Sequence, residues 1–148
     1  MQITSWYTRN FEDRLKGRYI TINHILPILD HYREIFNVSA AGFSENGVEI
    51  PLVSFGQGAK KVLIWSQMHG NEATGTLALL EFLELISIEK LEDVWSELSF
   101  VCVFMVNPDG ASKFKRRNGY NIDINRDAQA GKALETKFLK GQLKIERP

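Results

Sequence analysis

Apolar residues recur along this chain in patterns that predict three helices and several strands. Helical spacing covers residues 22–36, and a second, largely apolar helix is predicted over residues 73–88. A third helix is predicted over residues 130–143. Residues 61–66 and 99–106 form largely uninterrupted apolar runs, which are typical of strands that are covered on both faces.

Two further segments, residues 38–43 and 48–55, have the composition of strands and flank the turn that contains Asn46-Gly47. Asn-Gly between two such segments is a strong signal for a β-hairpin, because both residues tolerate the left-handed backbone that a tight turn requires. We therefore predict an antiparallel pair of strands that precedes the first apolar run.

The two apolar runs are separated by the predicted helix 73–88, an order that predicts two parallel strands with a right-handed crossover. Together with the hairpin, this predicts an α/β fold with a mixed, largely parallel sheet flanked by helices. Parallel strands end at the same sheet edge, so the turn with His69 and Glu72 should lie beside the turn that starts at Asn107. Ligands of open α/β sheets bind at that edge. Residues 107–128 are predicted to form a long polar loop.

His69 and Glu72 are the first candidates for chemistry, because they lie on the turn where a buried strand becomes a helix. Imidazole and carboxylate are both zinc ligands, and a turn lets both point at one spot above the sheet edge. The alternative is a lone histidine bonded to a carboxylate in a first helical turn, where glutamate is common without any metal. Gly70 and Gly75 favour the zinc pair, because they allow tight backbone approach around it.

The same spacing occurs a second time, between His31 and Glu34. This copy lies inside the predicted helix 22–36, with no sheet edge beneath it. A solvated helix face is therefore the favoured interpretation. His24 is interpreted in the same way, and no partner is predicted for it.

A further candidate region is the basic and polar segment at residues 113–127. A short basic run in a neutral chain gives little support to nucleic-acid binding, and a solvated loop is the plain alternative. The sharper interpretation is anion recognition, because arginine binds carboxylates through two parallel hydrogen bonds. Asn125 beside Arg126 could add a neutral donor to the same oxygens, and Asp123 could orient one of these side chains.

Length and composition restrict the remaining interpretations. The 148 residues are one domain or part of a larger one, and 18 basic residues balance 18 acidic ones. This balance gives no support to bulk attraction to nucleic acid or to an anionic membrane. The single cysteine, Cys102, excludes an internal disulfide and is expected to be a small buried apolar residue. The N-terminus lacks a signal-peptide pattern and no apolar run approaches ~18 residues, so a cytoplasmic location is expected.

Taken together, these residues resemble the zinc carboxypeptidase family, over its N-terminal half. The His-x-x-Glu turn, the Asn-Pro-Asp-Gly turn, an arginine seven residues before an aspartate, and the closing Asp-x-Asn-Arg occur in the family's order and spacing. The likeness covers approximately residues 35–145. One motif alone would be weak evidence, whereas four in register are specific. The family's fold is a mixed-sheet α/β sandwich, in agreement with the pattern of strands and helices.

The resemblance assigns roles to individual residues around a Zn²⁺ ion. His69 and Glu72 resemble the family's first two zinc ligands. Arg116 matches the arginine that polarises the scissile carbonyl and stabilises the oxyanion, and the adjacent Arg117 is the weaker match. The implied reaction is attack by a zinc-activated water on the last peptide bond of a substrate.

Asn125 and Arg126 resemble the family's pair that binds the C-terminal carboxylate of the substrate. The resemblance thus implies an exopeptidase whose partner is a peptide with a free carboxylate. Two alternatives remain. Relatives of the family use the same His-x-x-Glu and Asn-Arg elements to deacylate small amino acids such as succinylglutamate or N-acetylaspartate, although the Asn-Pro-Asp-Gly turn favours the peptidase. The chain could also be a non-catalytic, carboxylate-binding remnant that has lost its zinc.

The sequence also departs from the family pattern. Asp127 stands where the family commonly has Asn or Gln. The family's third zinc ligand is a histidine on a later strand, and its catalytic glutamate follows further on, but no histidine follows His69 here. Residues 134–148 resemble the helix that precedes the third-ligand strand. We therefore expect residues 1–148 to be the N-terminal portion of one catalytic domain, inactive alone, with an unpaired sheet edge that promotes self-association.

Overall fold

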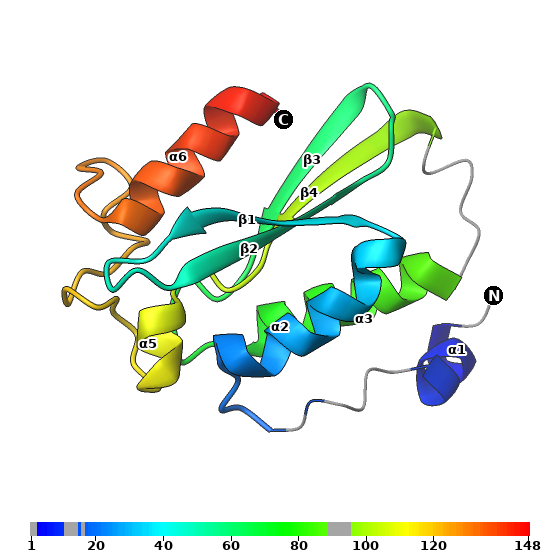
Figure 1. The fold of residues 1–148 in the computed structure, drawn as a ribbon, viewed down its shortest axis with the longest axis horizontal. Coiled ribbons are helices and arrows are strands. Elements are labelled where there is room, and N and C mark those ends of the chain that lie inside the picture. The colour runs from blue at the N-terminus through cyan, green and yellow to red at the C-terminus, as the bar shows by residue number, and fades with distance from the viewer. Residues whose placement is uncertain (1–2, 11–14, 16, 89–95) are drawn as a thin grey trace.

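The computed structural model describes residues 3–10, 15, 17–88 and 96–148, and its elements form three layers around one mixed sheet (Figure 1). The strands lie in the order β1-β2-β4-β3. Helices α2 and α3 cover one face of the sheet, and α6 lies on the other. The bounds are α1 (Ile3–Asn10), α2 (Ile22–His31), η1 (Tyr32–Glu34), β1 (Asn37–Phe43), β2 (Glu49–Phe55), β3 (Lys60–Trp65), α3 (Thr74–Ile88), β4 (Leu98–Val103), α5 (Pro108–Ser112) and α6 (Leu134–Glu146).

Strand β4 supplies side chains to both cores, which explains its uninterrupted apolar sequence. Phe100 and Cys102 belong to the larger core beneath α2 and α3, whereas Val101 and Val103 face the smaller core under α6. Cys102 is fully buried, as expected, and its burial raises the pKa of the thiol to about 12. The apolar runs in the sequence therefore reflect a sheet that is covered on both faces.

The predicted hairpin is confirmed. Strands β1 and β2 pair antiparallel, from Asn37 opposite Ser54 to Phe43 opposite Glu49. Gly47 adopts φ +76° in the connecting turn, which is a backbone conformation that glycine reaches without steric cost. The Asn-Gly signal thus identified both the turn and the pairing of its flanking strands.

The predicted strand–helix–strand unit is confirmed as well. Strands β3 and β4 pair in parallel, from Lys60 opposite Leu98 to Trp65 opposite Val103. The sheet is mixed, but β2 joins β4 antiparallel, so parallel pairing among the described strands is confined to β3 and β4. Strand β3 lies at one edge of this sheet, with no strand on its outer side in the part of the chain that the structure describes.

The apolar run predicted as strand 99–106 leaves the sheet earlier than expected. Strand β4 ends at Val103, and two residues later Met105 adopts a left-handed conformation, with φ +49°. The backbone nevertheless remains paired, since Val106 N donates to the carbonyl of Ser66 at 3.0 Å. This pairing brings the chain after β4 against the chain after β3.

The region 107–128 is not entirely a loop, because it begins with the short helix α5. Asn107 caps this helix by accepting a hydrogen bond from Gly110 N at 2.8 Å, and Pro108 occupies the first helical position. Helix α6 begins at Leu134 rather than at residue 130. The delay has a clear cause, since the buried Asp127 carboxylate accepts from the backbone amides of residues 132 and 133, at 3.0 and 2.8 Å.

The predicted helix 22–36 is confirmed over most of its length, as α2 followed by η1. One expectation about it was wrong, because His24 does have a partner. Its Nδ1 accepts a hydrogen bond from Thr21 N at 3.0 Å, which satisfies an amide at the helix N-terminus. Within the described residues, the model contains no helix with the length and apolar character needed to cross a bilayer.

Candidate functional site

The turn after β3 is held by a buried amide side chain. Gln67 is buried and left-handed, with φ +48°, and its Nε2 donates to the carbonyls of Gly70 at 2.9 Å and Ile20 at 3.1 Å. Its Oε1 accepts from the Thr76 hydroxyl at 2.7 Å. These contacts fix the backbone on both sides of His69.

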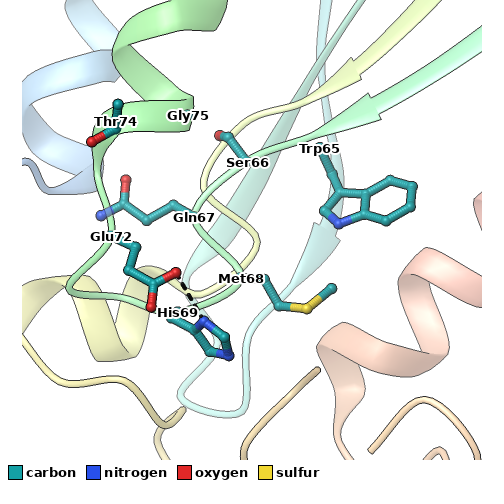
Figure 2. Close-up of a pocket in the computed structure, with 8 residues that line it drawn as sticks. All are labelled: Trp65, Ser66, Gln67, Met68, His69, Glu72, Thr74 and Gly75. Carbon is teal, nitrogen blue, oxygen red and sulfur yellow. Dashed lines mark hydrogen bonds and ion pairs between the residues drawn. The ribbon is translucent and has the colours of Figure 1, made fainter. Parts of the chain in front are cut away.

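His69 and Glu72 face each other beside a pocket of about 430 Å³, which Figure 2 shows. The Nδ1 atom of His69 lies 3.0 Å from Oε2 of Glu72. His69 is 8% exposed, whereas the Glu72 side chain is 59% exposed. Trp65 and Met68 form an apolar part of the pocket wall. The pair therefore presents its polar atoms to a space that is open to solvent on one side.

Asp123 and Arg116 complete a closed ring of contacts with this pair. Oδ1 of Asp123 lies 3.2 Å from His69 Nε2, and its Oδ2 accepts from Arg116 Nε at 2.9 Å. Arg116 closes the ring, because its terminal NH1 nitrogen donates to Glu72 Oε1 at 3.2 Å. The predicted residues His69 and Glu72, on the turn after β3, and Arg116, in the loop after α5, are thus linked by hydrogen bonds between two separate segments.

The charge of Asp123 is set by opposing effects. Its partial burial acts to raise the pKa of the carboxyl. Hydrogen bonds from Arg116 and His69, together with the positive charge of Arg116, outweigh this and lower the pKa to about 2. Asp123 is therefore an anion at neutral pH and can hold both a cationic arginine and an imidazole N–H.

His69 Nδ1 and Glu72 Oε2 have the chemistry and spacing of two metal ligands. A neutral imidazole has one N–H, so it can donate to only one of its two carboxylate neighbours. If Nε2 donates to Asp123, the Nδ1 lone pair faces Glu72, and that contact requires a second proton or a cation. Donors on one tetrahedral zinc at ~2.0–2.1 Å lie about 3.3 Å apart, close to the 3.0 Å between Nδ1 and Oε2. Among the described residues, however, no group of three or more His, Cys, Asp or Glu side chains could hold a metal ion.

One buried amide joins the His69 turn to the Arg116 loop. Nδ2 of Asn107 donates to the carbonyls of Met68 at 3.3 Å and Arg116 at 3.1 Å. The two backbones also touch, since a Cβ added to Gly70 would lie 2.1 Å from the carbonyl carbon of Gly110. The expectation that the two turns lie side by side is confirmed.

Asn125 and Arg126 differ from the other candidates, because both are exposed. No side-chain hydrogen bond or ion pair of either residue is found in the described part of the chain. Arg126 is tied to the site only through its backbone, whose N–H donates to the carbonyl of Asp123 at 3.0 Å. Their role as a carboxylate clamp stays a prediction.

Sequence reasoning did not foresee two contacts of this site. Asp123 was expected to orient one of the anion-binding side chains, and it does accept from Arg116 Nε, but its contact with His69 was not expected. The bridging role of Asn107 was also missed. Its position before a proline was a usable signal for a helix cap, whereas the two carbonyls that it reaches belong to distant segments.

Comparison with known proteins places these motifs in one family. The model of the zinc carboxypeptidase family matches residues 23–140, which is most of the chain. The search among curated proteins finds no match.

Solved structures of metallo-carboxypeptidases share the fold. A metallo-carboxypeptidase from Burkholderia cenocepacia has a TM-score of 0.74 at 18% identity, over 85% of this chain and 38% of that one. The enzyme from Pseudomonas aeruginosa, in complex with (2-guanidinoethylmercapto)succinic acid, has a TM-score of 0.72 at 21% identity, over 86% of this chain and 37% of that one.

A third solved structure shares the fold over nearly the whole chain. Carboxypeptidase A from Helicoverpa armigera has a TM-score of 0.68 at 16% identity, and the match covers 99% of this chain and 48% of that one. At such low identities the likeness shows the fold alone. The chain spans less than half the length of each of these three proteins.

Proposed function

Since this chain belongs to the zinc carboxypeptidase family, we propose that it carries part of the active site of a zinc-dependent carboxypeptidase. His69 and Glu72 would hold the metal, and Arg116 would act on the scissile carbonyl. The observation that carries this proposal is the position of the His69 ring between two carboxylates, with Glu72 also within reach of Arg116. A metal ion is the partner that these donors suit, because both are zinc ligands.

The chain's own residues would prepare the site in a defined way. Asp123 would accept a hydrogen bond from the Nε2–H group of His69, which would leave the Nδ1 lone pair available to a metal beside Glu72. When bound, zinc would supply a water of lowered pKa and polarise the substrate carbonyl. Arg116 uses Nε and one terminal nitrogen in its ion pairs, so its remaining N–H groups can donate to a developing oxyanion.

Asn125 and Arg126 are proposed to bind the C-terminal carboxylate of a peptide. Their exposure supports this role, because neither side chain is occupied by a partner within the described residues. An arginine fork and a neutral amide can bind both oxygens of a carboxylate. A substrate without that carboxylate would leave the arginine unpaired, which is a source of exopeptidase specificity.

We propose that residues 1–148 alone bind zinc weakly and do not hydrolyse peptides. No histidine follows His69 in the sequence, and no third ligand is found among the described residues. Catalytic zinc sites generally use three protein ligands. Calorimetric titration of the purified chain with zinc should therefore give a Kd on the order of micromolar or weaker. Nanomolar affinity of the isolated monomer would contradict the proposal.

The same purified chain separates the catalytic proposal from a non-catalytic one. Metal analysis is combined with a binding assay that compares one peptide as its free acid and as its C-terminal amide. A chain that binds zinc and prefers the free acid supports the carboxypeptidase site. A zinc-free chain that still prefers the free acid supports a carboxylate-binding remnant instead.

Strand β3 also supports the expectation of self-association. Its outer edge carries no strand in the described part of the chain, and unpaired strand edges are templates for pairing with another copy. A sedimentation coefficient that does not change between low and high protein concentration would contradict this expectation.

A further inference from the structure

A single buried side chain connects the two halves of the proposed site. Asn107 is fully buried and lies four residues after the end of β4, at the start of α5. We infer that Asn107 is a positioning residue, which holds the turn with His69 and Glu72 at a fixed separation from the loop with Arg116. This inference rests on the proposed function, because it concerns the geometry between metal ligands and the carbonyl-polarising arginine.

The orientation of the Asn107 amide is determined by its own helix. Its Oδ1 accepts from Gly110 N at 2.8 Å, as the cap of α5. Nδ2 is therefore presented to the opposite side, where two backbone carbonyls lie within reach. Both hydrogens of the amide group are used, so the side chain has no freedom to rotate without losing contacts.

The two carbonyls belong to the two functional segments. Met68 O lies 3.3 Å from Nδ2 and forms part of the peptide bond that leads into His69. Arg116 O lies 3.1 Å from Nδ2, on the residue whose guanidinium reaches Glu72. One amide thus fixes the backbone origin of a metal ligand and of the arginine at the same time.

A second contact makes the separation sensitive to Asn107. Gly70 N donates to the same Arg116 carbonyl at 3.4 Å, and Gly70 packs directly on Gly110. Close-packed interiors transmit displacements rather than absorb them. A shift of either segment would therefore change the contact between Arg116 and Glu72, which now measures 3.2 Å.

Asn118 provides a matched control within the same chain. It is buried too, and its Oδ1 accepts from the amides of Tyr120 and Ile122, at 3.1 and 2.8 Å. Its Nδ2 donates to Glu135 at 2.9 Å, on the first turn of α6. Asn118 has the chemistry and burial of Asn107, but within the described residues its side chain makes no hydrogen bond to His69, Glu72 or Arg116.

The test compares Asn107→Ser with Asn118→Ser in the full chain. Serine retains a hydroxyl that caps α5 through Gly110 N, but it is too short to bridge two carbonyls. Both variants should lower the Tm by about 3–10 °C, since both remove buried hydrogen bonds. Only Asn107→Ser should weaken zinc binding, by ~10–100-fold, as expected for a residue that orients metal ligands. Equal zinc affinities in the two variants would overturn the inference.

A second measurement does not depend on zinc. Amide hydrogen exchange of Gly70 in the metal-free chain reports whether the two turns stay together. Asn107→Ser should speed exchange of the Gly70 amide at least ~tenfold more than exchange of the sheet amides. Asn118→Ser should change the Gly70 amide and the sheet amides by similar factors. If the wild-type chain binds no zinc, the metal assignment fails, and unchanged Gly70 exchange in Asn107→Ser would still overturn the role of Asn107.

Asn107→Asp serves if Asn107→Ser does not fold. The carboxylate keeps the size and the acceptor for Gly110 N, but it replaces both donated hydrogen bonds by repulsion from two carbonyl oxygens. Asn118→Asp is its control. The expected results are the same as for the two serine variants. If Gly70 exchanges in Asn107→Asp at the same rate as in Asn118→Asp, the inference is wrong.

Discussion

Residues 31–34 and residues 69–72 both place a histidine three positions before a glutamate, yet they lie in different surroundings. His31 ends α2 and Glu34 lies in η1, and both side chains are exposed. No hydrogen bond or ion pair joins this pair in the described structure. His69 is buried and both of its ring nitrogens face carboxylates.

The difference between the two pairs comes from their neighbours. His69 lies after a parallel strand, where the chain that follows β4 brings Asp123 and Arg116 to the same edge. Among the described residues, His31 makes a ring contact with the adjacent Tyr32, at 5.5 Å between centroids, and no side-chain hydrogen bond or ion pair of it is found. Spacing supplies two donors, but the sheet edge supplies the groups that orient and charge them.

The largest difference is expected between two single variants, His69→Ala and His31→Ala. His69→Ala should abolish measurable zinc binding, because it removes one of two donors. His31→Ala should leave the zinc affinity within about twofold of the wild type. Isothermal titration with zinc checks both variants. Equal losses of affinity in the two variants would remove the distinction between the pairs.

The next effect concerns the acidic partner of the buried pair. Asp123→Asn should weaken zinc binding by ~10–100-fold, since Asp123 holds His69 Nε2 and Arg116 Nε. Glu34→Gln is the control at the exposed pair and should have no effect. Competition with a chromophoric chelator measures both affinities. Asp123→Asn with wild-type affinity would show that His69 needs no orienting partner.

A smaller effect is expected for Asp127→Asn, which should lower the free energy of unfolding by about 1–3 kcal/mol. Burial acts to raise the pKa of Asp127, but hydrogen bonds from the amides of Lys132 and Ala133 outweigh it, so the pKa is lowered. A lowered pKa gives stability that is present above pH ~4 and is lost as the pH falls through the folded-state value.

The pH dependence provides the measurement for Asp127. Urea denaturation at pH 6 and pH 3 should show that the wild type loses more stability on acidification than Asp127→Asn does. The difference between the two proteins should therefore shrink at low pH. A difference that stays constant over this range would mean that the Asp127 charge contributes nothing to the fold.

The smallest effect is expected beside the exposed pair. Asp30 accepts from Arg33 Nε at 2.7 Å, but the two side chains are 58% and 54% exposed. Exposed ion pairs contribute about 0–1 kcal/mol, so Asp30→Asn should change the free energy of unfolding by no more than ~0.5 kcal/mol. Chemical denaturation compares it directly with Asp127→Asn. A loss as large as that of Asp127→Asn would contradict the ranking of buried over exposed carboxylates.

Local patterns made part of this molecule predictable. The Asn46-Gly47 turn, the apolar strands and the contact between His69 and Glu72 all depend on residues that are close in the sequence. Their identification needs only backbone preferences and alternation of apolar positions. The family resemblance then added expected roles for Arg116, Asn125 and Arg126.

Long-range contacts were not predictable in the same way. Asp123 meets His69 across 54 positions, and Asn107 meets Met68 across 39. Such contacts depend on the order of strands in the sheet, which the sequence pattern does not determine. Helix α5 was missed because five residues are too few for a periodic signal, and the late start of α6 depends on one buried carboxylate at Asp127.

The indole of Trp65 has a practical consequence, because it is 41% exposed and lines the pocket beside His69 (Figure 2). Indole emission changes when the polarity around the ring changes, so an ion or peptide that enters the pocket should alter the fluorescence of this residue. The chain has three tryptophans, and Trp65→Phe would supply the background from the other two. Trp65 should therefore report optically on occupancy of the pocket, without any need for turnover.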